Sequence, residues 1–187
     1  SAKTRGYWFQ AQSSYVITGI HASDGNPNGI NANSQSVEII EFPTIPGTTS
    51  GGSHTVLFSA IDAGSGWLSC NINIVAGNYY GIIGAKHNSN DSTMYNSYDT
   101  LSNPKVLIID GNPTMCSRLL LQSSLALGSP SPGSYYWNII GTGNWVPIGR
   151  IDIITSQICS HTEILNLTIE TSGCTDSTAI NYNPLAT

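Results

Sequence analysis

Short stretches in which apolar and polar residues alternate recur along the whole chain, and this period of two limits the fold more than any other feature. In SCNINI (residues 69–74), cysteine and isoleucine alternate with serine and asparagine. Residues two apart lie on the same face of a β-strand, so one face of such a strand is expected to be buried and the other to face solvent. Gly, Asn, Ser and Pro, which favour turns, separate the stretches. We therefore predict an all-β fold, an antiparallel β-sandwich or jelly-roll-like domain of about ten to eleven short strands.

We expect the chain to consist of two parts. A β-sandwich domain covers residues 1–155, and a C-terminal extension covers residues 156–187. The extension contains one further alternating stretch, ILNLTIE (Ile164 to Glu170), and a closing motif with one cysteine. The leucine-rich stretch at residues 117–127 is ambiguous between helix and strand. Its Ser-Ser interruption and its strand-rich neighbours favour a strand.

The charge pattern excludes two classes of partner. Charged residues make up only 9% of the chain, and the formal net charge is −5. The Lys and Arg residues are scattered singly, whereas a nucleic-acid-binding protein needs clustered cations. No apolar run approaches the ~20 residues that span a bilayer. We therefore expect no nucleic acid and no membrane span. Uncharged polar surfaces suit an extracellular or cell-surface protein whose copies pack together, so self-association is expected.

The four cysteines bear on whether the protein is secreted or cytosolic. Cys70, Cys116, Cys159 and Cys174 have no C-x-x-C spacing, and no histidine lies at zinc-finger distance from a pair. The chain begins with Ser1, as a mature secreted protein would after removal of its signal peptide. In a secreted protein the four cysteines predict two disulfides. The alternative is buried free thiols in a cytosolic protein.

No motif of an enzyme is present. The four histidines are far apart in sequence, and no G-x-S-x-G elbow occurs. Glu38 and Glu41 lie three apart on one expected strand, hence on opposite faces, and cannot flank a cleft as a glycosidase pair does. We expect a protein that is not an enzyme and that has no cofactor.

Two loops hold candidate ligand sites. DGNPNG resembles the start of a calcium loop, with Asp24, Asn26 and Asn28 as oxygen ligands. Its twelfth position is Gln35 rather than a bidentate Glu, which favours a plain turn, so any calcium binding is expected to be weak.

Aromatic residues suggest a different ligand. In the loop at residues 86–103, Tyr95 and Tyr98 could stack on sugar rings, which is the basis of an alternative function: a carbohydrate-binding module of a larger secreted protein.

The last residues resemble a known repeat. GCTDSTAINYNPLAT (residues 173–187) is similar to the first half of a Cys-containing repeat, GCTD-x-x-A-x-NYNP-x-A, of surface and secreted proteins of Bacteroidota. In that repeat a second cysteine follows after an acidic turn. The resemblance implies that the parent chain continues beyond Thr187. The partner of Cys174 is then either Cys159 or a cysteine in the following sequence.

The larger part resembles a bacterial extracellular β-sandwich family. The resemblance lies in the RGYWF start (residues 5–9), the glycine-rich segment from Val75 to Gly84, and the late Gly149-Arg150-Ile151. It implies a cell-surface module without catalytic residues. Three Asp-Ser/Thr triplets also resemble the O-glycosylation acceptor motif of Bacteroidota. They imply a glycoprotein with acceptors at Ser92, Thr100 and Ser177.

These features together predict a secreted, non-enzymatic structural or adhesive module of the cell surface. The stretch from Ile164 to Glu170 lies outside the sandwich domain and has the alternation of a strand. It could pair with the sheet edge of a neighbouring copy, a mode in which backbone hydrogen bonds give the affinity. Head-to-tail contacts of this kind produce filaments.

Overall fold

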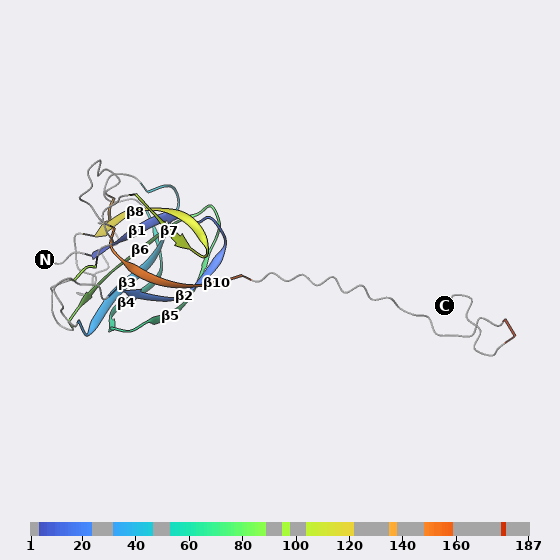
Figure 1. The fold of residues 1–187 in the computed structure, drawn as a ribbon, viewed down its shortest axis with the longest axis horizontal. Coiled ribbons are helices and arrows are strands. Elements are labelled where there is room, and N and C mark those ends of the chain that lie inside the picture. Colours follow the sequence, from blue (N-terminus) through green and yellow to red (C-terminus); the bar gives the residue numbers. More distant parts are fainter. Residues whose placement is uncertain are drawn as a thin grey trace.

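The fold is seen in a computed structural model, which describes residues 4–23, 32–46, 53–88, 95–97, 104–121, 135–137, 148–158 and 177–178. Within these ranges, ten strands form two antiparallel sheets that pack face to face (Figure 1). No helix occurs within these ranges. The predicted antiparallel β-sandwich is therefore confirmed.

Sheet A holds seven strands and sheet B holds three. The strands of sheet A are β1 (Thr4–Gln10), β3 (Ser34–Phe42), β4 (Thr55–Gly64), β6 (Tyr79–His87), β7 (Lys105–Ile109), β8 (Asn112–Leu121) and β9 (Tyr135–Trp137). Their order is β4-β3-β6-β1-β8-β7, and β9 also pairs with β8. The strands of sheet B are β10 (Ile151–Gln157), β2 (Tyr15–Ala22) and β5 (Leu68–Ile74), in that order. The ambiguous leucine-rich stretch begins within β8, a strand as predicted.

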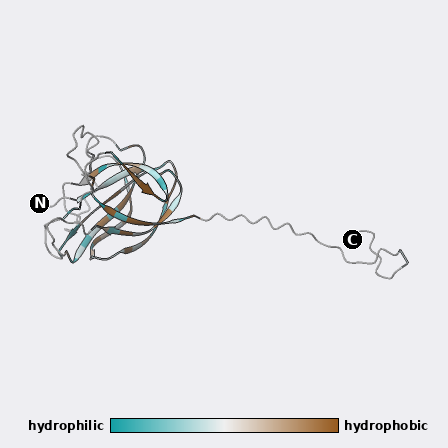
Figure 2. Cartoon of the chain, viewed as in Figure 1, coloured by the Kyte–Doolittle hydropathy of each residue, from teal (hydrophilic) through white to brown (hydrophobic). Residues whose placement is uncertain are grey.

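The main core lies between the two sheets. Alternate side chains of the central strands are buried there, among them Phe9, Ile17, Ile39 and Ile82, each with no exposed surface. A second apolar cluster lies on the opposite face of sheet A, and its buried members are Trp8, Ile40, Phe42, Ile83 and Leu119. Sheet A is therefore apolar on both faces, which explains why its strands carry so many consecutive hydrophobic residues (Figure 2).

Tyr7 joins the two sheets. Its side chain extends from β1 into the main core, and its hydroxyl donates a hydrogen bond to the carbonyl oxygen of Ile151 in β10 at 3.1 Å. Because only 3% of the residue is exposed, burial raises the pKa of the phenol well above its ordinary value. The hydroxyl thus stays neutral and serves as a structural donor.

Three glycine-containing segments that are far apart in sequence meet at one place. Arg5 pairs with Gly84 across β1 and β6, and the Gly149 N–H donates to the Gly6 carbonyl oxygen at 3.3 Å. A Cβ atom on Gly149 would lie 2.5 Å from the backbone carbon of Arg5, so the backbones approach as closely as only glycine allows. The RGYWF start, the glycine-rich segment and the late Gly-Arg pair are thus one structural unit.

Candidate functional site

Many of the residues singled out in the sequence lie outside the described part of the chain: Asp24, Asn26, Asn28, Ser92, Tyr98, Thr100, Cys159 and Cys174. The described candidates are Cys70, Cys116, Tyr95 and Ser177. Ser177 lies in a turn and is exposed, as a glycosylation acceptor needs to be.

The two described cysteines correct the disulfide prediction. Both Cys70 and Cys116 are free thiols, so neither is joined to the other. Cys116 lies in β8 with no exposed surface, and burial raises the pKa of its thiol to about 12. Cys70 lies in β5, half-buried, and burial raises the pKa of its thiol as well. Both thiols fill space in the apolar interior as small hydrophobic side chains do.

This arrangement predicts a clear order of thiol reactivity. In the folded protein at pH 8, iodoacetamide should modify Cys70 slowly and leave Cys116 unmodified, because only the exposed thiolate reacts. The Cys70 rate should keep rising above pH 9, since its pKa is raised from 9.0. Peptide mapping by mass spectrometry, before and after unfolding in urea, measures the extent of modification of each thiol. Recovery of a disulfide-linked Cys70–Cys116 peptide would contradict the structure.

Tyr95 has a structural contact. Its N–H donates to the Lys86 carbonyl at 2.7 Å, and the Lys86 N–H donates to the Tyr95 carbonyl at 2.9 Å, so it forms an isolated antiparallel bridge with the end of β6. The residue is half-buried. The prediction that Tyr95 and Tyr98 stack on sugars stays a prediction.

The sandwich is incompletely closed along β4 and β5. Among the apolar side chains that pack against the main core but remain partly exposed, Leu107 lies on β7 and Ile153 on β10. The other six are Leu57, Phe58 and Ala60 of β4 and Leu68, Cys70 and Ile72 of β5. In the central strands, by contrast, the inward side chains are buried. We call these six residues the open side of the sandwich.

The open side coincides with two sheet edges. Among the described residues, β4 pairs only with β3 in sheet A, and β5 pairs only with β2 in sheet B. The two edge strands follow each other in sequence and lie along the same side of the domain (Figure 1). An edge strand presents backbone N–H and C=O groups that can template another strand. The open side therefore combines free backbone groups with a partly exposed apolar interior.

The turn between β4 and β5 is held by a buried glutamine. Gln35 has no exposed surface, and its Nε2 donates to the carbonyl oxygens of Gly64, at 2.7 Å, and Gly66. Its Oε1 accepts a hydrogen bond from the Ala22 N–H at 2.8 Å. The Gln35 side chain thus ties this turn to β2. Because β4 belongs to sheet A and β5 to sheet B, it fixes the connection between the two sheets.

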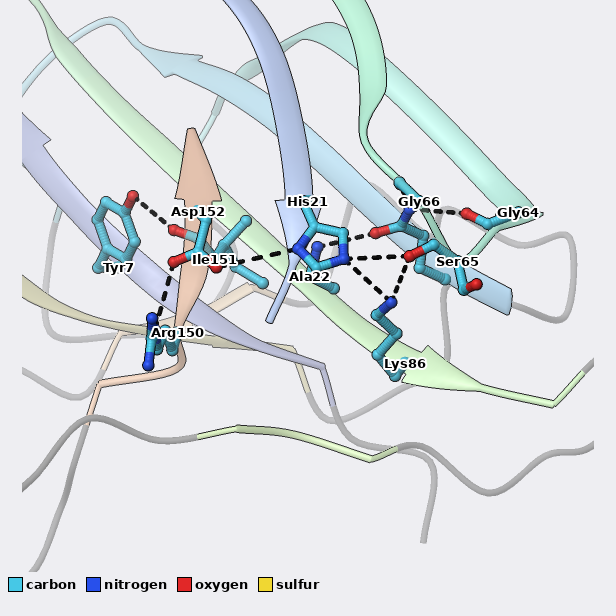
Figure 3. A network of polar contacts seen from close by, with 11 residues as sticks. Tyr7, His21, Ala22, Gly64, Ser65, Gly66, Lys86, Arg150, Ile151 and Asp152 are labelled. Carbon is cyan, nitrogen blue, oxygen red and sulfur yellow. Dashed lines mark hydrogen bonds and ion pairs between the residues drawn. The ribbon is translucent and has the colours of Figure 1, made fainter. Parts of the chain in front are cut away.

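A lysine and a histidine hold the same turn (Figure 3). Lys86, only 4% exposed, donates from Nζ to the Ser65 carbonyl at 2.5 Å, and Nζ lies 3.2 Å from Nε2 of His21. Nε2 also lies 3.1 Å from the Ser65 carbonyl oxygen, so the ring contacts the turn directly. The other ring nitrogen, Nδ1, lies 3.9 Å from Oδ2 of Asp152. The imidazole therefore lies between a cation and a carboxylate.

An exposed tryptophan directly follows the turn that these contacts hold. Trp67 follows the fixed turn, is 51% exposed, and its ring centroid lies 5.3 Å from that of His21. His21 pairs with Asp152 across β2 and β10, and Arg150 Nε lies 3.3 Å from Oδ1 of Asp152. We call Trp67, His21, Asp152 and Arg150 the tryptophan row. It crosses one end of sheet B.

A pocket with a volume of about 380 Å³ is lined by residues 41–43, 53–55 and 77–79. It contains one carboxylate, Glu41, and one imidazole, His54. Glu41 accepts a hydrogen bond from Asn78 Nδ2 at 2.9 Å, and His54 packs edge-on against Phe42. Both groups thus have structural contacts in the pocket.

The described residues contain no group of three side chains that could hold a metal ion. No helix long and apolar enough to cross a membrane is found among them. In comparisons with known proteins, no family model matches the chain, and neither a curated protein nor a solved structure matches it significantly.

Proposed function

We propose that the protein is a secreted, non-enzymatic structural module of the cell surface whose copies assemble by strand addition. The observation that carries the proposal is the open side, where two adjacent sheet edges leave apolar inward side chains partly exposed. A strand added to β5 would pair its backbone with the free edge and cover these side chains. Recognition of this kind takes its affinity from the backbone and its specificity from alternate side chains.

The proposed occupant is the segment from Ile164 to Glu170 of a neighbouring copy. It has seven residues, as β5 has. Leu165, Leu167 and Ile169 fall on one face of such a strand, with the same spacing as the inward residues of β5. The segment begins six residues beyond Ile158, where the described stretch that contains β10 ends, and six residues span at most about 20 Å.

A second apolar surface supports association between copies. On the β7–β8 hairpin, Val106 pairs with Met115, and these residues are 52% and 57% exposed. Ile108, on the same face of β7, is 69% exposed. β7 is the edge of sheet A opposite β4. Contiguous exposed apolar patches mark interaction sites. Exposed apolar residues at both the β4 edge and the β7 edge of sheet A would suit a head-to-tail assembly, in which different surfaces of two copies meet.

The extracellular part of the proposal rests on composition. The charge content of 9% and the uncharged polar surface suit an exported assembly, and Ser177 is exposed as an acceptor of O-linked glycan must be. Intact-mass analysis of the native protein tests this directly. Added hexose mass that maps to the peptide with Ser177 would support it, and an unmodified mass would count against glycosylation.

A competing peptide tests strand addition in the full chain. A synthetic peptide of residues 162–171 should dissociate the oligomers, because it occupies the β5 edge without offering a second sandwich to the next copy. Sedimentation velocity should show the oligomer population falling as peptide is added, and electron microscopy should show shorter particles or filaments.

The matched control is the same peptide with Leu165, Leu167 and Ile169 replaced by serine, which keeps the backbone but not the apolar face. It should leave the oligomers intact. Two results would contradict the proposal: a protein that stays monomeric at high concentration, or oligomers that both peptides leave unchanged.

A further inference from the structure

Sheet B presents an outward face that the proposed assembly does not use. Strand addition at β5 would engage its backbone edge and its inward residues, Leu68, Cys70 and Ile72. The residues between them, Ser69, Asn71 and Asn73, are exposed on the opposite face of the strand. Trp67 precedes them with the same alternation and is 51% exposed. One aromatic ring thus borders a face of hydroxyl and amide side chains.

The exposed ring is held more firmly than a surface tryptophan needs to be. Two buried side chains, Gln35 and Lys86, hold the turn that precedes it through hydrogen bonds to three successive carbonyls, those of Gly64, Ser65 and Gly66. Burial of an ammonium group is costly unless it is well satisfied. A ring fixed before a ligand arrives loses little entropy on binding. The geometry is that of a preorganised platform.

The ring has one supported face and polar neighbours. His21 lies against Trp67, with an interplanar angle of 33°, and is itself flanked by Asp152. Asp152 is 33% exposed and Arg150 is 56% exposed. A carboxylate accepts hydrogen bonds and a guanidinium donates them, and the hydroxyls of a sugar can do both. The C–H face of a pyranose ring is apolar and matches an exposed indole.

We propose that the tryptophan row, Trp67 with His21, Asp152 and Arg150, is a carbohydrate-binding site that takes a pyranose unit of a glycan chain. The sugar stacks on Trp67, and its hydroxyls are hydrogen-bonded by Asp152 and Arg150. Neighbouring units of the glycan extend over Ser69 and Asn71 of β5. The site lies on the outward face of sheet B, whereas strand addition would use the backbone edge and the inward side chains of β5, so the glycan and the added strand take different surfaces of this strand.

Tryptophan fluorescence measures this binding directly. The full-length protein is titrated with cellohexaose, xylohexaose, mannohexaose and maltohexaose. At least one should change the emission saturably, because a stacked sugar removes water from the Trp67 ring. Trp67→Ala should weaken binding of that sugar by about tenfold or more, the loss typical of a central aromatic contact. Trp67→Tyr, which keeps an aromatic face, should restore part of the affinity. For these variants, whose fluorescence changes, calorimetry replaces the emission signal.

Val75→Ala is the matched control. Val75 is also 51% exposed and lies just beyond the other end of β5, so its loss should leave binding unchanged. Circular dichroism should show Trp67→Ala to be folded, since the ring is half exposed. Absence of binding by all four sugars, or binding that Trp67→Ala leaves intact, would overturn the proposal. If Tyr95→Ala rather than Trp67→Ala removes binding, the platform lies on the loop at residues 86–103 instead.

Discussion

Replacement of Gly6 by alanine is expected to destabilise the domain by roughly 3 kcal/mol or more. A Cβ atom at this position would lie 1.8 Å from the Ile82 carbonyl oxygen and 2.7 Å from the Cα of Ile83. All the nearest atoms belong to the backbone of β6, so no side-chain rotation relieves the overlap. β1 lies between β6 and β8 in sheet A, and the sheet can accommodate Gly6→Ala only by moving a central strand.

Urea unfolding followed by circular dichroism measures the change in the free energy of unfolding. Gly64→Ala is the control, because nothing lies within 4 Å of a Cβ atom there. The control should stay within about 0.5 kcal/mol of the parent protein, as neutral surface substitutions do. Equal stability of Gly6→Ala and the parent would mean that β1 and β6 are not as close as described.

Replacement of Leu167 by aspartate is expected to abolish self-association. Under the proposed strand addition, this side chain lies at the centre of the donated strand and faces the partly exposed interior beside Cys70 and Ile72. Burial of an unpaired carboxylate costs several kcal/mol, and a loss of about 4 kcal/mol weakens association by about a thousandfold. Sedimentation velocity should therefore show a monomer at concentrations at which the parent protein is oligomeric.

Thr168→Asp is the matched control, since it introduces the same charge one position away on the solvent face of the same strand. It should leave association nearly unchanged. If Thr168→Asp and Leu167→Asp have equal effects, charge in the extension rather than the face of a strand governs assembly, and strand addition by this segment is wrong.

The fold class could be predicted from the sequence because the physical signal is local. Alternation in residues 69–74 predicts an inward face and an outward face, and β5 shows both. The Asp110-Gly111 pair also carries a local signal, since both residues adopt positive φ, 50° and 76°, in the two-residue turn between β7 and β8. Such a pair favours the hairpin turn whose twist matches the flanking strands.

The open side and the tryptophan row could not be predicted, because each depends on which residues, distant in sequence, come together in the fold. Nothing local to Gln35 or Lys86 indicates that both hold one turn, which lies about thirty residues from the first and about twenty from the second. The tryptophan of GSGW carried a weak signal, an aromatic residue directly after a Gly-Ser turn. The disulfide expectation failed for Cys70 and Cys116 because a cysteine count shows neither burial nor distance. The open side follows from strand order, which requires the three-dimensional fold.

A single cross-linking measurement shows whether a neighbouring copy donates residues 164–170 to the β5 edge. Cys70 is a natural thiol on the open side, and Leu167→Cys places a second thiol at the centre of the donated strand. Isotopically light and heavy copies of the variant are mixed, and oxidised glutathione is added under native conditions. Mass spectrometry then identifies the disulfide-linked peptides.

Strand addition predicts a disulfide between position 167 of one copy and Cys70 of another, seen as mixed light–heavy peptides and abolished by Cys70→Ser. Exclusively light–light and heavy–heavy peptides would show that the segment folds back onto its own sandwich. That result, or the absence of any link between the two positions, would contradict assembly by strand addition.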